Sequence, residues 1–183
     1  MTKQVLFVQG GGADAHDRWD NRLVESLERE LGQSYDVRYP RMPNEADPRY
    51  ADWKAALVVE FGTLDDGAML VGHSIGGAIL VHTLAEQPPM SRLGGIFLIA
   101  APFIGKDGWR SDEIEPRTDF SERLPRGVPI FLYHGAEDDI VPFAHVHLYA
   151  KAIPQALVRP IAHGNHQLNN DLSEVARDIR AIG

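Results

Sequence analysis

The sequence contains no cysteine. A disulfide framework, a thiolate metal site and a cysteine nucleophile are therefore excluded. Positive charge is also scarce, because 18 Lys and Arg residues are scattered along the chain against 26 Asp and Glu, and the formal net charge is −8. Nucleic acids and anionic membranes are bound by clustered Lys and Arg, so we expect neither as a partner.

A long hydrophobic run is missing from the start of the chain. Residues 5–8 form the only apolar run before Gln9 and a group of glycines. This run is too short for the core of a signal peptide or for a membrane span, so we expect a cytoplasmic protein. The 183 residues, 44% hydrophobic and 24% charged, are typical of one soluble globular domain covering residues 1–183.

Short apolar runs alternate with helical patterns along the chain. Runs typical of buried strands lie at residues 5–8, 35–39, 68–72, 95–100, 128–133 and 156–160, and residues 101–127 are predicted to form a long loop. The alternation predicts an α/β fold, a doubly wound and mostly parallel six-stranded sheet with helices on both faces. Such sheets bind ligands at the carboxyl ends of their strands.

Apolar residues at helical spacing predict the helices between these strands. The first is predicted to pack through Trp19, Leu23, Val24, Leu27 and Leu31 and to stop at Gly32. Asp47 and Pro48 are predicted to be the N-cap and first residue of the next helix. Further helices are expected after residue 74, over residues 142–152, and from Leu168 to Ile179.

The sequence Val71-Gly72-His73-Ser74-Ile75-Gly76-Gly77 predicts a strand, a sharp turn and a helix, with a serine at the apex. A turn this tight brings the strand and helix backbones close together, so glycine is favoured at positions 72 and 76. It also lifts the serine hydroxyl to a helix N-terminus, where the Ile75 amide has no partner within the helix. Ser74 and Ile75 therefore offer a nucleophile and an oxyanion donor.

A serine nucleophile needs a base, and the base is best held by a carboxylate. Acidic residues follow the fifth predicted strand at Glu137, Asp138 and Asp139, and histidines follow the sixth at His163 and His166. This chain order of serine, acid and histidine is the one expected on such a sheet. Of the two histidines we favour His166, because the helical pattern that begins soon afterwards leaves it in a connecting loop.

Other histidines could supply metal ligands, but their spacing does not favour it. His163-x-x-His166 and His145-x-His147 match no recognised structural zinc pattern, and His145 and His147 face different ways on their predicted helix. No metal site is therefore expected. His16, His73 and His82 are predicted to be loop, turn and exposed helical residues.

On these motifs the chain resembles the α/β-hydrolases, and in particular the small, lid-poor bacterial serine hydrolases related to the retinoblastoma-binding-protein-9 group. Pro40-x-Met42-Pro43 followed by Trp53 is also similar to that group, whereas Gln9 and Asn165 depart from the family pattern. The resemblance of residues 134–142 to the family's acid loop implies that Asp138 is the triad acid. It also implies that the glycine turn after the first strand supplies a second oxyanion amide, from Gly11 or, failing that, Gly12.

The same glycine turn fits a second motif. Gly10-x-Gly12-x-x-Ala15 satisfies the dinucleotide fingerprint, which makes a nucleotide-binding protein an alternative. The second predicted strand lacks the acidic residue that would hold a ribose, and Asp14, Asp17 and Asp20 would repel a pyrophosphate. The fingerprint is therefore the weaker interpretation.

The sequence thus predicts a serine hydrolase that needs no metal or other cofactor and acts on a small-molecule carboxylic ester or thioester. Ser74, His166 and Asp138 are the predicted catalytic residues, with the Ile75 and Gly11 amides as the oxyanion hole. The predicted walls of a shallow substrate pocket are Met42, Phe103, Trp109 and Phe143. A non-catalytic binding protein on the same fold is the alternative from another class. The sequence gives no oligomeric state.

Overall fold

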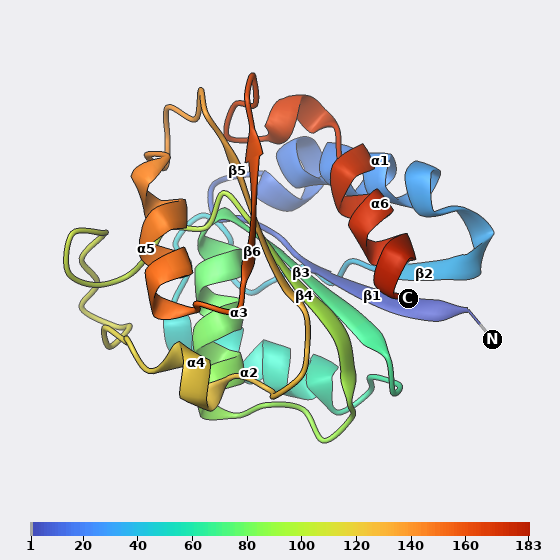
Figure 1. Cartoon of the computed structure of the whole chain (residues 1–183), viewed down its shortest axis with the longest axis horizontal. Helices are drawn as coiled ribbons and strands as arrows, with labels where there is room; N and C mark the ends of the chain where they lie inside the picture. Colours follow the sequence, from blue (N-terminus) through green and yellow to red (C-terminus); the bar gives the residue numbers. More distant parts are fainter. Residues whose placement is uncertain (1) are drawn as a thin grey trace.

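Parallel strands form a sheet that runs through the centre of the molecule (Figure 1). The computed structural model describes residues 2–183. Over this range the sheet has six strands in the order β2-β1-β3-β4-β5-β6, and every neighbouring pair is parallel. Their bounds are Lys3–Val8 (β1), Tyr35–Arg38 (β2), Ala68–His73 (β3), Leu93–Ile99 (β4), Ile130–Gly135 (β5) and Leu157–Ile161 (β6). The predicted doubly wound sheet is therefore confirmed.

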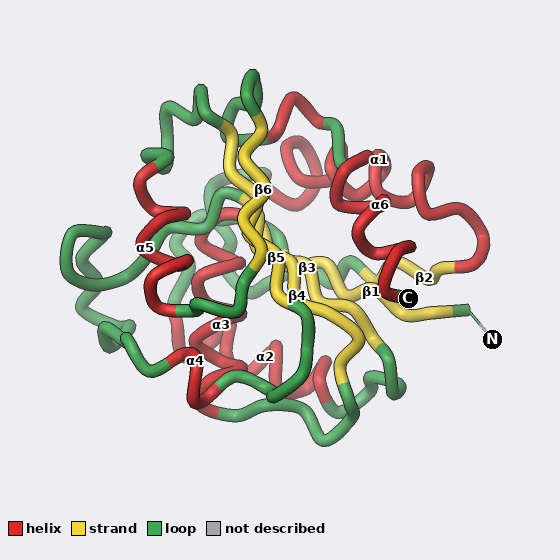
Figure 2. The backbone as a smooth tube through the Cα atoms, viewed as in Figure 1, coloured by secondary structure: helices red, strands yellow, loops and turns green. Residues whose placement is uncertain are grey.

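Helices cover both faces of the sheet (Figures 1 and 2). One face carries α1 (Asn21–Leu31) and α6 (Ser173–Ile182), and the other carries α2 (Tyr50–Phe61), α3 (Ser74–Glu86), α4 (Phe120–Arg123) and α5 (Ala144–Ala152). In β1, Leu6 and Val8 enter the core beneath α2 and α3, and Val5 and Phe7 enter the core beneath α1 and α6. The run is continuously apolar because both of its faces are buried. None of the described helices is long and apolar enough to span a bilayer.

Two predicted helix boundaries were wrong. Helix α2 begins at Tyr50 rather than Pro48, because the Tyr50 amide is bound by the Glu113 carboxylate at 2.8 Å, and Asp47 makes no cap. A residue 63 positions away thus supplies the cap. At the other end of the chain, Leu168 begins a separate 3-10 turn with φ of 45°, and α6 starts only at Ser173.

Two side chains were wrongly assigned to core or surface. Trp19 is 54% exposed because residues Ala15–Asp20 form a π-helix, whose wider turn moves Trp19 off the packed face of α1. His82 was expected to be exposed but is only 1% exposed, since both sides of α3 are covered. Its ring meets Phe120 edge to face, with 5.0 Å between the ring centroids.

The turn between β3 and α3 has the steric constraint that the sequence predicts. A Cβ on Gly72 would lie 2.6 Å from the Gly77 Cα, and one on Gly76 would lie 1.9 Å from the Gln9 carbonyl oxygen. Ser74 itself has a φ of 52°, in the left-handed region, which is energetically unfavourable for residues that carry a side chain. The glycines therefore let β1, β3 and α3 meet with the serine at the apex.

Replacing Gly76 by alanine should lower the free energy of unfolding by more than ~2 kcal/mol, because the new methyl group meets main-chain atoms that cannot turn away. The matched control is Gly62→Ala, where an added Cβ would lie 3.4 Å from its nearest neighbour and φ is −66°. This control should stay within ~0.5 kcal/mol of the wild type. Urea titration measures both, and equal midpoints for the two variants would contradict the close approach.

The burial of His82 should make stability depend on pH. Burial, together with the Arg117 charge, lowers the pKa of His82 from 6.5 to about 4. Between these values the unfolded chain takes up the proton and the folded chain does not, so stability should fall by ~2–3 kcal/mol as the pH drops from 7 to 4.5. In His82→Leu that part of the fall should be absent in urea titrations, whereas the exposed-site control His147→Leu should retain it. If stability fell equally with pH in both variants, His82 would not be the source of the pH dependence.

Candidate functional site

The predicted site residues meet at the carboxyl ends of the strands. The glycine turn follows β1, Ser74 follows β3, Asp138 follows β5, and His166 lies in the loop after β6. Parallel strands that are neighbours in the sheet place their following loops at one edge, which brings together residues far apart in the sequence.

Ser74, His166 and Asp138 form one hydrogen-bonded row. The Ser74 Oγ lies 2.9 Å from His166 Nε2, and His166 Nδ1 lies 2.9 Å from Asp138 Oδ2. The tautomer that satisfies both contacts donates from Nδ1 to the carboxylate and accepts the serine hydroxyl at Nε2. The Asp138 side chain is fully buried, while His166 keeps 14% exposure. The imidazole is therefore partly accessible to solvent, whereas the carboxylate is not.

Asp138 is held as a carboxylate by its donors. Its Oδ1 accepts the amides of Ile140 at 2.9 Å and Val141 at 2.8 Å, and His134 Nε2 lies 3.3 Å from its Oδ2. Burial alone would raise the pKa of this carboxyl, but the hydrogen bonds from His134, His166 and the Val141 amide keep its pKa below the usual 3.8. The group is thus ionised at neutral pH and can orient the imidazole.

A close contact between two loops brings Asp138 to His166. A Cβ on Gly135 would lie 2.0 Å from the Gly164 carbonyl oxygen. The end of β5 and the loop after β6 are therefore closer together than a residue with a side chain at position 135 would allow. Asn165, where the sequence departs from the family pattern, folds the second loop by accepting the amides of Gln167 at 3.0 Å and Asn169 at 2.9 Å. The departure is therefore accommodated by a local turn.

The rival acids and histidines lie elsewhere. His163 is 89% exposed in its side chain and pairs through Nδ1 with Glu137 at 3.0 Å. Asp139 is exposed. His145 is buried in α5 and accepts the Phe103 amide at 2.8 Å. Within residues 2–183, no three His, Asp or Glu side chains are grouped as metal ligands would be.

The three amides of the glycine turn have different partners. The Gly10 amide donates to Asp20 Oδ2 at 2.6 Å and the Gly12 amide to the Glu45 carbonyl at 2.6 Å. The amides of Gly11 and Ile75 donate to no other group within residues 2–183. A Cβ on Gly11 would lie 2.9 Å from Ile75 Cγ2, so the two free amides belong to residues in contact.

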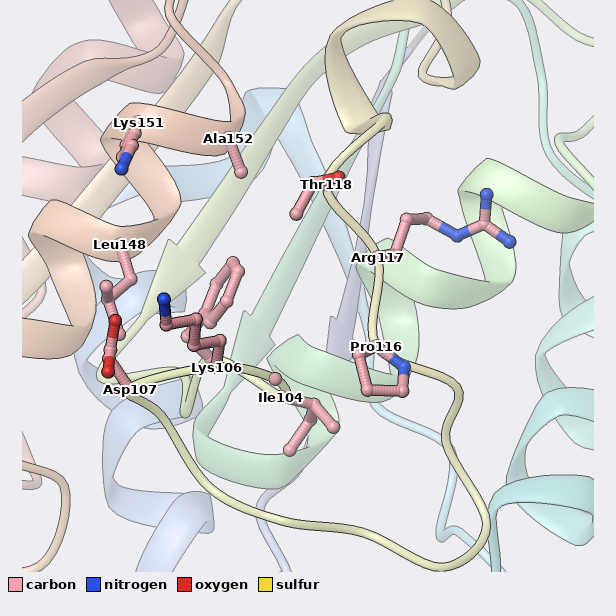
Figure 3. A pocket seen from close by; sticks show the side chains of 11 residues that line it. Ile104, Lys106, Asp107, Pro116, Arg117, Thr118, Leu148, Lys151 and Ala152 are labelled. Carbon is pink, nitrogen blue, oxygen red and sulfur yellow. The ribbon is translucent and has the colours of Figure 1, made fainter.

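Two cavities lie near this end of the sheet. The first, about 240 Å³, begins at Ile75 and is also lined by Pro48, Ile79, Ile114 and polar residues of the 111–113 loop. The second, about 340 Å³, lies between the 103–107 segment, the 116–118 segment and α5 (Figure 3). Only the first adjoins the serine turn, and it includes none of the predicted wall residues.

Those four residues have other surroundings. Met42 is 2% exposed and belongs to the core beneath α2. Phe103 lines the second cavity, Trp109 packs edge to face on His145, and Phe143 packs edge to face on His134. Aromatic and Met residues in loops give no sequence signal that separates a pocket wall from ordinary packing.

Three buried polar residues near the row were missed as site components. Gln9 accepts the Met42 amide at 3.0 Å and donates to Glu45 at 2.6 Å, which ties the 42–45 loop to β1. Asp20, considered only as a charge that would repel a pyrophosphate, and His73, predicted to be a turn residue, are buried against each other. Gln9 and His73 adjoin the glycine and serine motifs in the sequence, whereas Asp20 adjoins neither, so no local signal marked it.

Comparisons with known proteins identify the family. A model of the serine hydrolase family matches residues 5–173. The chain is 27% identical over 173 residues to YdeN of Bacillus subtilis (strain 168), a protein assigned as a hydrolase, and this match covers 93% of the chain and 89% of YdeN. The crystal structure of YdeN superposes with a TM-score of 0.78, at 24% identity over 99% of this chain and 98% of that one.

More distant structures share the fold. Alpha/beta hydrolase domain-containing protein 10 from mouse has a TM-score of 0.69 at 18% identity, over 99% of this chain and 89% of that one. The esterase RhEst1 from Rhodococcus sp. ECU1013 has a TM-score of 0.69 at 16% identity, over 100% of this chain and 92% of that one. The chain thus has the α/β-hydrolase fold and belongs to the serine hydrolase family.

Proposed function

We propose that this hydrolase cleaves a small carboxylic ester or thioester through an acyl-enzyme, with Ser74, His166 and Asp138 as its catalytic triad. The proposal is carried by the two contacts of 2.9 Å that join the three side chains in the order a triad requires. The strained φ of Ser74 supports it, because such strain is kept where a side chain must be presented for chemistry.

In the proposed reaction the Ser74 hydroxyl attacks the carbonyl carbon while His166 Nε2 takes its proton. The tetrahedral intermediate then collapses, the bond to the leaving group breaks, and His166 returns the proton to the departing oxygen or sulfur. Water, deprotonated by the same imidazole, then attacks the acyl-serine; the bond from the acyl carbon to Ser74 Oγ breaks, His166 returns the proton to that oxygen, and the acid is released. Asp138 stays ionised throughout and stabilises the imidazolium.

The amides of Ile75 and Gly11 are the proposed oxyanion hole. Of the three glycine amides after β1, those of Gly10 and Gly12 already donate to groups within the protein, which leaves Gly11. The same engagement argues against nucleotide binding, since a pyrophosphate would need those amides. Each oxyanion donor contributes on the order of 10²–10³ in rate.

The acyl group is proposed to enter the cavity beside Ile75. Its volume of about 240 Å³ is below that of most ligand pockets, and its apolar lining comes from Pro48, Ile79 and Ile114, so a short aliphatic acyl chain fits best. Asp112 and Glu113 also line it. Their charge disfavours an acyl chain that ends in a carboxylate.

The triad is tested by substitution. Ser74→Ala and His166→Ala should lower kcat for p-nitrophenyl acetate by ~10⁴-fold or more, and Asp138→Asn by ~10³–10⁴-fold, because the imidazole loses its orientation. Labelling by a fluorophosphonate should disappear in the Ser74 variant. The control His163→Ala should keep full activity, since that side chain points away to Glu137. A wild type that folds but neither labels nor turns over would refute the proposal.

The acyl cavity is tested by enlarging it. Ile114→Ala should raise the ratio of kcat/KM for p-nitrophenyl hexanoate over acetate by about tenfold, because the longer chain gains room. Leu148→Ala, which widens the second cavity instead, is the matched control and should leave the ratio unchanged. If only Leu148→Ala changed this ratio, the acyl chain would bind in the second cavity instead.

A further inference from the structure

Asp20 and His73 form a buried pair directly behind the catalytic row, and the mechanism above uses neither. Each is 1% exposed, and Asp20 Oδ2 lies 2.8 Å from His73 Nδ1. Asp20 ends the π-helix that follows β1, and His73 is the last residue of β3, immediately before Ser74. Burying a carboxylate and an imidazole costs free energy unless they are paired and hydrogen-bonded, as these are.

The pair is bonded to two loops of the site. His73 Nε2 lies 3.0 Å from the main-chain carbonyl oxygen of His166. Asp20 accepts the Gly10 amide at 2.6 Å and the Gln167 side-chain amide at 3.2 Å. The glycine turn after β1 and the loop that carries the proposed base therefore share one anchor.

These partners determine the charge of His73. A carboxylate and a carbonyl oxygen can only accept hydrogen bonds, so both ring nitrogens of His73 must carry hydrogen, which makes the ring an imidazolium. Burial opposes this charge, but the adjacent Asp20 carboxylate outweighs it and raises the pKa of His73 above 6.5. The same pairing outweighs burial at Asp20 and lowers its pKa.

Besides Asp20, the titratable groups around the His73 ring are His166, Asp138 and Tyr39. The His166 ring is 4.9 Å away between centroids, and the Asp138 charge acts on His73 from beyond it. On the far side, burial and the Asp20 charge raise the pKa of Tyr39, so that phenol is neutral. Among the described residues, Asp20 is therefore the charged group bonded directly to the His73 ring.

We propose that Asp20 and His73 are positioning residues for the hydrolase reaction. They fix the loop of His166 against the turn that holds Gly11, because His73 bridges Asp20 to the His166 carbonyl oxygen and Asp20 also accepts the Gly10 amide. This inference rests on the proposed function of Ser74 and His166.

Kinetics of Asp20→Asn and His73→Gln test the positioning role. Both variants should lower kcat by up to about 100-fold with little change in KM, because a small displacement of the base costs rate while the acyl cavity stays intact. The double variant should be about as slow as the slower single one.

Asp178→Asn is the matched control. Asp178 is also a buried carboxylate, on α6, and accepts the Tyr133 hydroxyl at 2.7 Å and Arg159 at 2.8 Å. This variant should lose stability without changing kcat. If the Asp20 and His73 variants behave like this control, with stability alone affected, the positioning role is overturned.

A spectroscopic measurement tests the pair without any assay of activity. In wild type labelled with 15N-histidine, the His73 ring, identified by its loss in His73→Gln, should have both nitrogens protonated at pH 7.5. A neutral His73 ring there would contradict the proposal whatever the rates of the variants. Fluorophosphonate labelling of wild type separates the two claims. If wild type does not label, the proposed function fails, whereas wild-type labelling with unchanged variant rates defeats only this inference.

Discussion

The site depends on one steric constraint, the close approach of three main-chain segments around the turn between β3 and α3. Because Gly76 rests against the Gln9 carbonyl, the end of β1 is locked beside the start of α3. Gly11 and Ile75, whose amides are free, are then in contact, and Ser74 lies at the turn with a strained φ of 52°. A buried carboxylate and imidazole behind the turn then bind the remaining loop. Main-chain contacts thus fix the positions of Ser74 and the two free amides, and the buried side-chain pair fixes the loop of His166.

Much of this arrangement can be predicted from the sequence, because the relevant signals are local. Apolar runs bounded by glycine and proline identify the strands, and their alternation with helical patterns identifies a parallel sheet. The glycines at 72 and 76 predict the turn, since a side chain there would meet main-chain atoms. Given parallel strands, residues after β3, β5 and β6 must share one edge, so Ser74, Asp138 and His166 can be expected to lie together.

Features that depend on distant residues could not be predicted. The start of α2 is fixed by Glu113, which no local pattern near Tyr50 reveals. The π-helix before α1 breaks the helical period at Trp19, and the burial of His82 follows from packing on Phe120. Asp20 and His73 are 53 positions apart, so their pairing follows only from the fold. The lining of the acyl cavity likewise combines α3 with residues 111–114, a loop that has no periodicity in the sequence.

The most direct test of the nucleophile is to observe the acyl-enzyme. The protein is mixed with p-nitrophenyl acetate, quenched with acid within the first turnover, digested and examined by mass spectrometry. If Ser74 is the nucleophile, one acetyl group appears on the peptide that contains it, and it disappears during a longer incubation as water releases the acid. An acetyl group on a different residue, or turnover of the ester with no acetylated peptide, would contradict the serine mechanism.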